Sequence, residues 1–224
     1  MNRTNPPPDD IRRALRGPRP GLAAQRRMAP RPRPGGYIPA LDRQPKQGGV
    51  LILIYPCDGE LCLVLTRRTE TVANHKGQIS FPGGAQEDKE TLQQTALREA
   101  GEELAVPPAT LEVLGALTPL YIPPSNYCIT PTVALAAARP TFRADPTEVV
   151  EVLEVPLRLL FDSQTVGEEE WEVRGIPARV PFYRVGLHKV WGATAMVLAE
   201  FLAMLDQATD EGRRTKDGRL RTGD

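Results

Sequence analysis

The sequence has few of the residues that mark a disulfide-bonded or zinc-binding protein. Of its 224 residues, three are cysteine and two are histidine. Cys57, Cys62 and Cys128 form an odd set, and their spacing fits neither a disulfide framework nor a CxxC metal knuckle. We therefore expect reduced, mostly buried thiols in a cytoplasmic protein.

Long apolar runs and a net charge are also missing. No stretch approaches the roughly 20 consecutive apolar residues of a membrane span, and the N-terminus lacks the apolar core of a secretory signal. Apolar residues make up 41% of the chain and charged residues 25%, which excludes wholesale disorder. The length fits one domain with tails. From the missing apolar runs we expect a cytoplasmic protein that does not bind a membrane.

The zero net charge hides a basic N-terminal arm. Residues 1–47 hold 10 of the 23 prolines and carry 11 Lys or Arg against 3 Asp or Glu, so their formal charge is +8 and that of residues 48–224 is −8. A basic arm can bind nucleic acid, but this one lacks interleaved aromatic residues to stack on bases, which favours a solvated tail. We expect a flexible arm that adds little to the core, with one short helix at 9–16, before a domain at 48–208 and a flexible tail at 209–224.

Apolar patterning divides the domain into several strands and two long helices. Residues 50–55 are typical of a strand buried on both faces, and Asp58-Gly59 predicts a hairpin turn to a partner strand at 61–66. Asp88 is the expected N-cap of a helix at 89–104. Further elements are expected as strands at 111–120, 129–137 and 149–156, a hairpin of 171–174 with 179–185, and a buried helix at 190–205. This order predicts an α/β fold, a mixed sheet with helices on both faces.

Three carboxylates crowd one side of the first long helix. Glu99, Glu102 and Glu103 stand at i, i+3 and i+4, within an arc of about 100°. Side chains placed so closely repel one another unless a cation lies among them. Oxygen ligands without histidine or cysteine select Mg²⁺, Mn²⁺ or Ca²⁺. The competing interpretation of these residues alone is a solvated acidic face.

The acidic helix belongs to a longer pattern, whose fixed positions are Gly84, Glu90, Arg98-Glu99-Ala100-x-Glu102-Glu103 and Val106. This pattern resembles the signature of the Nudix hydrolases. One position departs, because Ala105 replaces the family's glycine after the helix. The resemblance implies an α/β/α sandwich with a mixed sheet that needs Mg²⁺ or Mn²⁺. It implies that Glu99, Glu103 and Glu102 are the metal ligands. It also implies a catalytic set of four residues, in which Arg98 pairs with Glu90 and the others are Glu102 and Glu103.

The resemblance extends to the coenzyme A pyrophosphatase branch of that family. It rests on Val64-Leu65-Thr66-Arg67-Arg68-Thr69, on Gly77-x-x-x-Phe81-Pro82-Gly83-Gly84, and on the block from His188 to Ala195. Thr69 stands where Ser or Ala is usual, and Ala73 where an arginine is expected. The expected substrate-binding residues are Arg67, Arg68, His75, Lys76, Gly83 and Gly84.

The implied reaction splits the diphosphate of coenzyme A, or a derivative, into adenosine 3′,5′-bisphosphate and 4′-phosphopantetheine. Two alternatives remain open: a Nudix hydrolase of another nucleoside diphosphate, such as ADP-ribose or a damaged nucleotide, and a non-catalytic nucleotide sensor. The oligomeric state is not predicted. A general base is expected among acidic residues outside the helix, with candidates at Glu148, Glu151 and Glu168 to Glu170. For Trp171 and Tyr183, core packing is favoured over stacking on an adenine.

Overall fold

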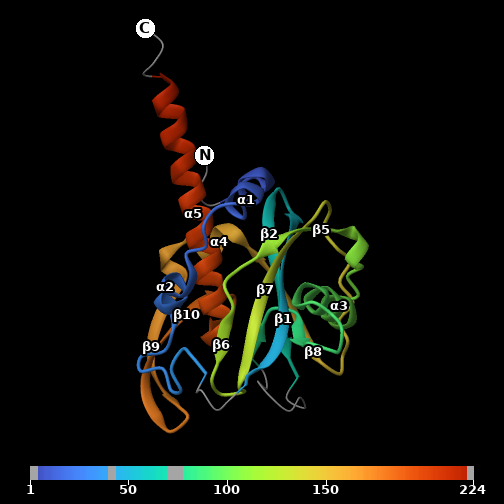
Figure 1. Ribbon diagram of the computed structural model, residues 1–224, viewed down its shortest axis with the longest axis vertical. Helices are drawn as coiled ribbons and strands as arrows, with labels where there is room; N and C mark the ends of the chain where they lie inside the picture. The colour runs from blue at the N-terminus through green and yellow to red at the C-terminus, as the bar shows by residue number, and fades with distance from the viewer. Residues whose placement is uncertain (1–4, 40–43, 70–77, 221–224) are drawn as a thin grey trace.

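The computed structural model describes residues 5–39, 44–69 and 78–220, and the side chains of all of these except 209–220. A large sheet stands between helix α3 (Leu92–Leu104) and helix α5 (Gly192–Leu220), and a smaller sheet lies on the α5 side (Figure 1). No helix in the described ranges is long and apolar enough to cross a membrane.

The large sheet is mixed, as predicted. Its central path runs β3-β2-β1-β7-β5, while β4 pairs with β1, β6 with β7 and β8 with β2. The β1–β7 pair is parallel and the others are antiparallel. The strands are β1 (Lys46–Cys57), β2 (Glu60–Arg68), β3 (Ile79–Ser80), β4 (Gly83–Ala85), β5 (Leu111–Ala116), β6 (Leu120–Ile122), β7 (Tyr127–Ala136) and β8 (Val149–Pro156).

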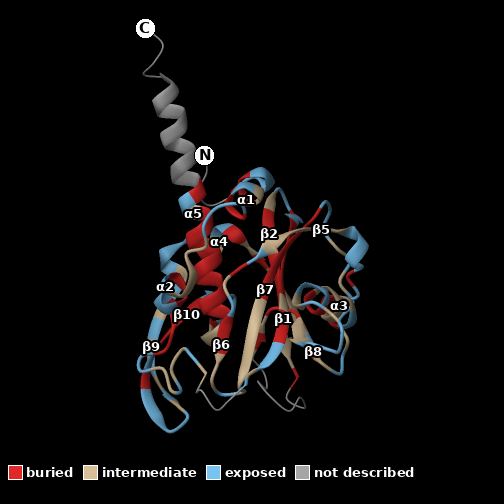
Figure 2. Ribbon diagram, viewed as in Figure 1, coloured by how far each residue is buried: buried red, intermediate tan, exposed pale blue. Residues whose placement is uncertain are grey.

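The two faces of β1 supply two separate cores. Leu51 and Leu53 pack with α3, whereas Ile52 and Ile54 belong to the core that contains α5. All four side chains are fully buried, so β1 is drawn as buried through its centre (Figure 2). The alternation follows from the period of two in a strand. It confirms the prediction of a strand buried on both faces within an α/β/α sandwich.

Helix α3 ends at Leu104, as expected, but begins later than expected. Its N-cap is Thr91, not Asp88, because Thr91 and Gln94 form a capping box. Lys89 has φ of 71°, which excludes it from the helix. At the other end, Ala105 adopts the left-handed conformation with φ of 56°. The alanine therefore keeps the backbone that the family's glycine would favour, at a cost of about 1 kcal/mol.

The N-terminal arm is not a free tail, which corrects our expectation. Helices α1 (Pro8–Ala14) and α2 (Gly21–Gln25), followed by the 3-10 turn η1 (Arg26–Met28), pack against α5. Ile11, Leu15 and Met28 are buried in the same core as α5. The prolines were misleading because they lie before α1 or in its first turn, between α1 and α2, or after η1, where they interrupt no helix.

Several other boundaries also differ. The strand predicted at 111–120 is divided into β5 and β6, and His188–Trp191 forms strand β11 before α5 begins. Helix α5 continues to Leu220, past the expected end near residue 205 and through much of the predicted tail. The smaller sheet has the order β11-β10-β9, with β9 at Val166–Val173 and β10 at Ile176–Val185. Glu168 to Glu170, three of the general-base candidates, therefore lie within strand β9. Short helical segments complete the chain: η2 (Pro108–Thr110), α4 (Leu157–Phe161) and η3 (Ser163–Thr165).

Candidate active site

Two glycines bring α3 against the sheet. A Cβ on Gly49 of β1 would lie 2.2 Å from the carbonyl oxygen of Leu92, so the helix start approaches β1 as closely as a glycine allows. A Cβ on Gly84 of β4 would lie 2.3 Å from Oε1 of Glu99. Gly84 thus leaves the space that the Glu99 carboxylate occupies, which explains physically why this turn precedes an acidic helix.

Arg98 ties the loop before α3 to the helix. Its Nη2 donates to Oε1 of Glu90 at 2.9 Å and to the carbonyl oxygen of Ala85 at 3.1 Å. Its Nη1 donates to Glu99 at 3.0 Å and to Glu102 at 2.9 Å. The hydrogen bond from Arg98 lowers the pKa of Glu90 to about 2. The structure therefore contains the expected pair of Arg98 with Glu90.

Glu103 is the most buried of the three helix carboxylates, with 2% of its surface exposed. Arg68 Nη1 donates to Oε1 at 3.2 Å, whereas Oε2 has no hydrogen-bond partner within the described part of the chain. Burial raises the pKa of Glu103 to about 8, with Arg68 opposing that shift and the nearby Glu148 and Glu99 adding to it. A buried carboxylate with one unused oxygen is unusual in a folded protein and invites a functional explanation.

The carboxylates near Glu103 differ in their exposure to solvent. Glu99 is largely buried, and burial raises its pKa, whereas the side chain of Glu102 is 59% exposed. Glu148 lies just before β8 and accepts from Arg68 Nη2 at 3.2 Å. Arg68 therefore bridges Glu148 and Glu103. Arg98 and Arg68 form ion pairs with these carboxylates. Among the described acidic, histidine and cysteine side chains, no group of three is arranged to hold a metal ion.

The chemistry of this set still fits a hard divalent cation. All the donors are carboxylate oxygens, two of the acids are buried enough to disfavour their charged forms, and Glu103 has an oxygen without a partner. A positive ion would relieve each of these conditions. The residues present therefore fit the Mg²⁺ or Mn²⁺ that the acidic helix predicts.

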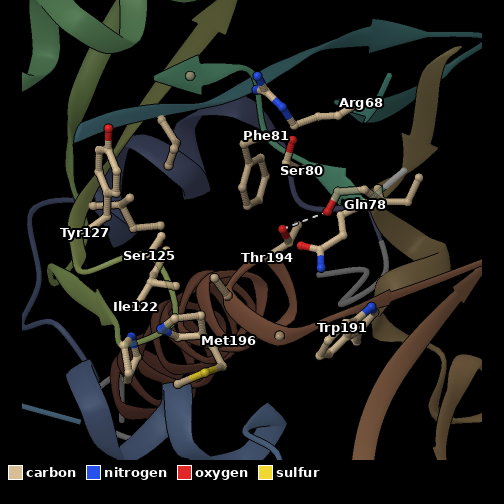
Figure 3. Close-up of a pocket in the computed structure, with 18 of the residues that line it drawn as sticks. Arg68, Gln78, Ser80, Phe81, Ile122, Ser125, Tyr127, Trp191, Thr194 and Met196 are labelled. Atoms are coloured by element: carbon tan, nitrogen blue, oxygen red, sulfur yellow. Dashed lines mark hydrogen bonds between the residues drawn. The ribbon is translucent and has the colours of Figure 1, made fainter. Parts of the chain in front are cut away.

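A cleft of about 850 Å³ opens beside the carboxylates. Glu99, Glu148 and Arg68 belong to its wall. Apolar side chains that include Phe81, Ile122 and Met196 line its middle, with Trp191 at one side (Figure 3). Its volume is in the upper part of the range of about 300–1,000 Å³ typical of small-molecule sites. Gly83 and Gly84 also line it, as expected of substrate-binding residues.

Other predicted substrate-binding residues lie elsewhere or outside the description. Arg67 does not belong to the cleft wall, and its Nε donates to Glu151 at 3.0 Å. Glu151 also contacts His188, with 3.2 Å between Oε1 and Nε2. His75 and Lys76 lie outside the described residues.

The structure separates the candidate general bases. Glu168 pairs with Arg31 and with Arg179, and Glu169 pairs with Lys189. Of the five predicted candidates, Glu148 is the one that lines the cleft. Trp171 stacks on Phe182 with ring centroids 5.9 Å apart, and Tyr183 is buried, so the structure supports core packing of both aromatic residues.

Sequence reasoning missed one wall of the cleft. Pro30, Arg33 and Pro34 of the N-terminal segment line it, as do the residues from Ile122 to Ser125. Neither group carries a motif, and both reach the cleft through tertiary packing. The pairing of Lys46–Ile54 of β1 with 127–135 of β7 was the missing information, since it brings the segment before β7 to the cleft.

Comparison with known proteins agrees with this architecture. Residues 45–173 match the NUDIX domain. A relative from Photorhabdus laumondii, named uncharacterized Nudix hydrolase NudL, is 37% identical over 63% of this chain and 76% of its own length. A relative of the same name from Pectobacterium atrosepticum is 38% identical over 69% of this chain and 80% of its own. The solved MutT protein from Methanosarcina mazei Go1 has a TM-score of 0.47 at 15% identity, over 77% of this chain and 99% of that one. The chain belongs to the Nudix family and is a hydrolase of nucleoside diphosphate derivatives.

Proposed function

We propose that the protein hydrolyses the diphosphate of coenzyme A or a derivative of it, giving adenosine 3′,5′-bisphosphate and 4′-phosphopantetheine. The observation that carries this proposal is the joining of two environments in one cleft. Glu99 and Glu148 give the cleft an acidic part, and Phe81, Ile122 and Met196 give it an apolar part (Figure 3). A diphosphate with a long, uncharged pantetheine arm matches both parts. The block from Leu65 to Gly84, which resembles the coenzyme A branch, supports the same substrate.

The proposed roles follow from burial and contacts. Glu99 and Glu103 would hold Mg²⁺ or Mn²⁺, with Glu102 completing the set. A bound divalent ion would neutralise phosphate oxygens and lower the pKa of the attacking water. Arg98 fixes the acidic helix against the Glu90 loop. We assign the general base to Glu148, because it lines the cleft and lies beside Glu103 on the same arginine.

Free thiols at all three cysteines support the cytoplasmic location that we propose.

A substrate panel tests the proposal. The purified protein with Mg²⁺ or Mn²⁺ is offered coenzyme A, 3′-dephospho-coenzyme A, ADP-ribose and an oxidised nucleoside triphosphate, and products are identified by mass spectrometry. We expect kcat/KM for coenzyme A to exceed that for the dephospho form by at least about tenfold, the effect of one charge-assisted phosphate contact. Removing the metal with a chelator should abolish turnover.

Two controls separate this proposal from its alternatives. In ¹⁸O-labelled water the label should enter one of the two phosphomonoester products, because a single phosphorus is attacked. If ADP-ribose or the triphosphate outperforms coenzyme A under matched metal conditions, the substrate assignment is wrong. Binding without turnover in every metal would indicate the nucleotide sensor.

A further inference from the structure

The cleft has a wall that lies outside the matched NUDIX domain. Pro30, Arg33 and Pro34 belong to the basic N-terminal segment, and all three line the cleft. The matched domain begins at residue 45. The segment thus contributes directly to the space where a substrate lies, and this gives its basic character a use that the sequence alone did not indicate.

This segment is fixed in place from two sides. The backbone groups of Arg31 and Arg179 of β10 form two hydrogen bonds of 2.9 Å. Nη2 of Arg33 donates to the carbonyl oxygen of Tyr121 in β6 at 2.7 Å. A Cβ on Gly35 would lie 2.4 Å from Cβ of Pro123, so the chain also passes very close to the loop after β6. Arg33 is therefore held by ordered backbone rather than by a free tail.

The guanidinium of Arg33 is a cation without an anion. It lies 4.6 Å from the ring centroid of Tyr37, and its Nη1 is buried without a hydrogen-bond partner among the described residues. No carboxylate in the described ranges forms an ion pair with it, whereas Arg68 and Arg98 each hold two or more. Burial lowers the pKa of Arg33, so an anion beside it would be favourable.

The charges around Arg33 leave it as the net positive group of this wall. Glu172 near the end of β9 and Arg174 in the β9–β10 turn also line the cleft, and they carry opposite charges. Glu99 and Glu148 line the cleft as well. The arginines expected to meet a phosphate, Arg67 and Arg68, are already paired with carboxylates.

We propose that Arg33 forms a subsite for a phosphomonoester of the substrate that is separate from the diphosphate. The inference rests on the proposed function, under which this group is the 3′-phosphate of coenzyme A. The planar guanidinium presents several donors to one phosphate. The cleft then orients the substrate through two groups of residues, with the diphosphate at the carboxylates and the monoester at Arg33.

Arg33→Met tests the subsite, with Arg26→Met as the matched control. The guanidinium of Arg26 also contacts the Tyr37 ring, 4.4 Å from its centroid, but Arg26 does not line the cleft. Binding of adenosine 3′,5′-bisphosphate and of 5′-AMP is measured by calorimetry on the full chain with Mg²⁺. In the wild type and Arg26→Met, we expect the bisphosphate to bind at least about tenfold more tightly. In Arg33→Met the ratio should fall to about two or less.

Turnover supplies a second and independent measurement. The ratio of kcat/KM for coenzyme A over 3′-dephospho-coenzyme A should fall by about tenfold in Arg33→Met, because only coenzyme A loses a phosphate contact. If Arg33→Met lowers the melting temperature, Arg33→Gln is measured instead, because its amide can still donate to the Tyr121 carbonyl. Unchanged ratios in the folded variant overturn the subsite.

The two proposals fail in different ways. If coenzyme A is hydrolysed well but Arg33→Met leaves both ratios unchanged, the substrate assignment survives and the subsite does not. If coenzyme A is not hydrolysed but the bisphosphate preference depends on Arg33, the subsite survives and the substrate is another phosphorylated nucleotide.

Discussion

Two buried glutamates, one on each long helix, differ in how far their carboxylate oxygens are hydrogen-bonded. Glu200 of α5 is fully buried and accepts four hydrogen bonds, from the backbone amides of Gly21 and Thr118, the hydroxyl of Thr118 and the amide of Gln25, at 2.7–3.2 Å. Glu103 of α3 is almost as buried, but one of its oxygens has no partner among the described residues. Burying a charge is costly unless hydrogen bonds or opposite charge compensate it.

The difference separates a structural acid from a functional one. The partners of Glu200 come from α2 and from the segment between β5 and β6, so this carboxylate joins the N-terminal segment to the body. The second oxygen of Glu103 has no hydrogen-bond partner in the part of the chain that the structure describes, and the cleft-lining Glu99 and Glu148 lie near this side chain. We infer that satisfied bonds at Glu200 serve stability, and that the unused oxygen at Glu103 serves metal binding.

The largest expected effect on stability comes from deleting the N-terminal segment, which Glu200 binds through Gly21 and Gln25. Deleting residues 1–30 should leave the protein largely unfolded at 37 °C. Burial of Ile11, Leu15 and Met28 contributes on the order of 1.5–3 kcal/mol each, and their loss exposes the facing side of α5. Thermal unfolding followed by circular dichroism measures the effect, with deletion of residues 1–4 as the control. A melting temperature within about 3 °C of the wild type, equivalent to about 1 kcal/mol for a chain of this size, would show that these contacts are dispensable.

Glu103→Gln should remove activity without removing stability. We expect turnover to fall about 10³-fold or more, equivalent to about 4 kcal/mol of barrier height. The metal-free protein should melt at the same temperature or slightly higher, because the buried amide is neutral without the proton that folded Glu103 must keep above the pKa of the unfolded chain. Glu102→Gln is the matched comparison on the same helix, and its exposed position predicts a smaller loss. Near-normal turnover of Glu103→Gln at saturating Mg²⁺ would make the ligand assignment wrong.

Glu200→Gln should show the opposite separation. The amide retains one acceptor but turns an NH₂ group toward donors, so the free energy of unfolding should fall by about 1–3 kcal/mol. Because Glu200 does not line the cleft, kcat per folded molecule should stay within about twofold of the wild type. Urea unfolding and active-site-normalised kinetics check the two parts. A loss of kcat that exceeds the loss of folded protein would assign Glu200 a role in the reaction.

What the sequence could predict depends on how far apart the interacting residues lie. The acidic face and the pair of Arg98 with Glu90 were predictable, because helix spacing and one loop place them. The bridge from Arg68 to Glu148 joins residues 80 positions apart through the β2–β8 pairing, and no local pattern encodes that. Local spacing did contain an overlooked signal in the arm, since Ile11 and Leu15 stand four residues apart on one face of a helix.

The smallest expected effect is a pH dependence that Glu103 imposes on the metal-free protein. Its pKa is about 8 in the folded state and about 4.3 when unfolded. Between these values the unfolded chain has released a proton that the folded protein keeps, so stability falls as pH rises, by no more than about 1.4 kcal/mol per pH unit. Urea unfolding at pH 6 and pH 7 with a chelator should therefore show a loss of about 1 kcal/mol that Glu103→Gln lacks. Added Mg²⁺ should reverse the trend, because the metal binds the ionised carboxylate and stabilises the protein more at higher pH. Parallel pH profiles for the wild type and Glu103→Gln would show that the Glu103 carboxylate gives up its proton as readily in the folded protein as in the unfolded chain, and would remove the contrast with Glu200.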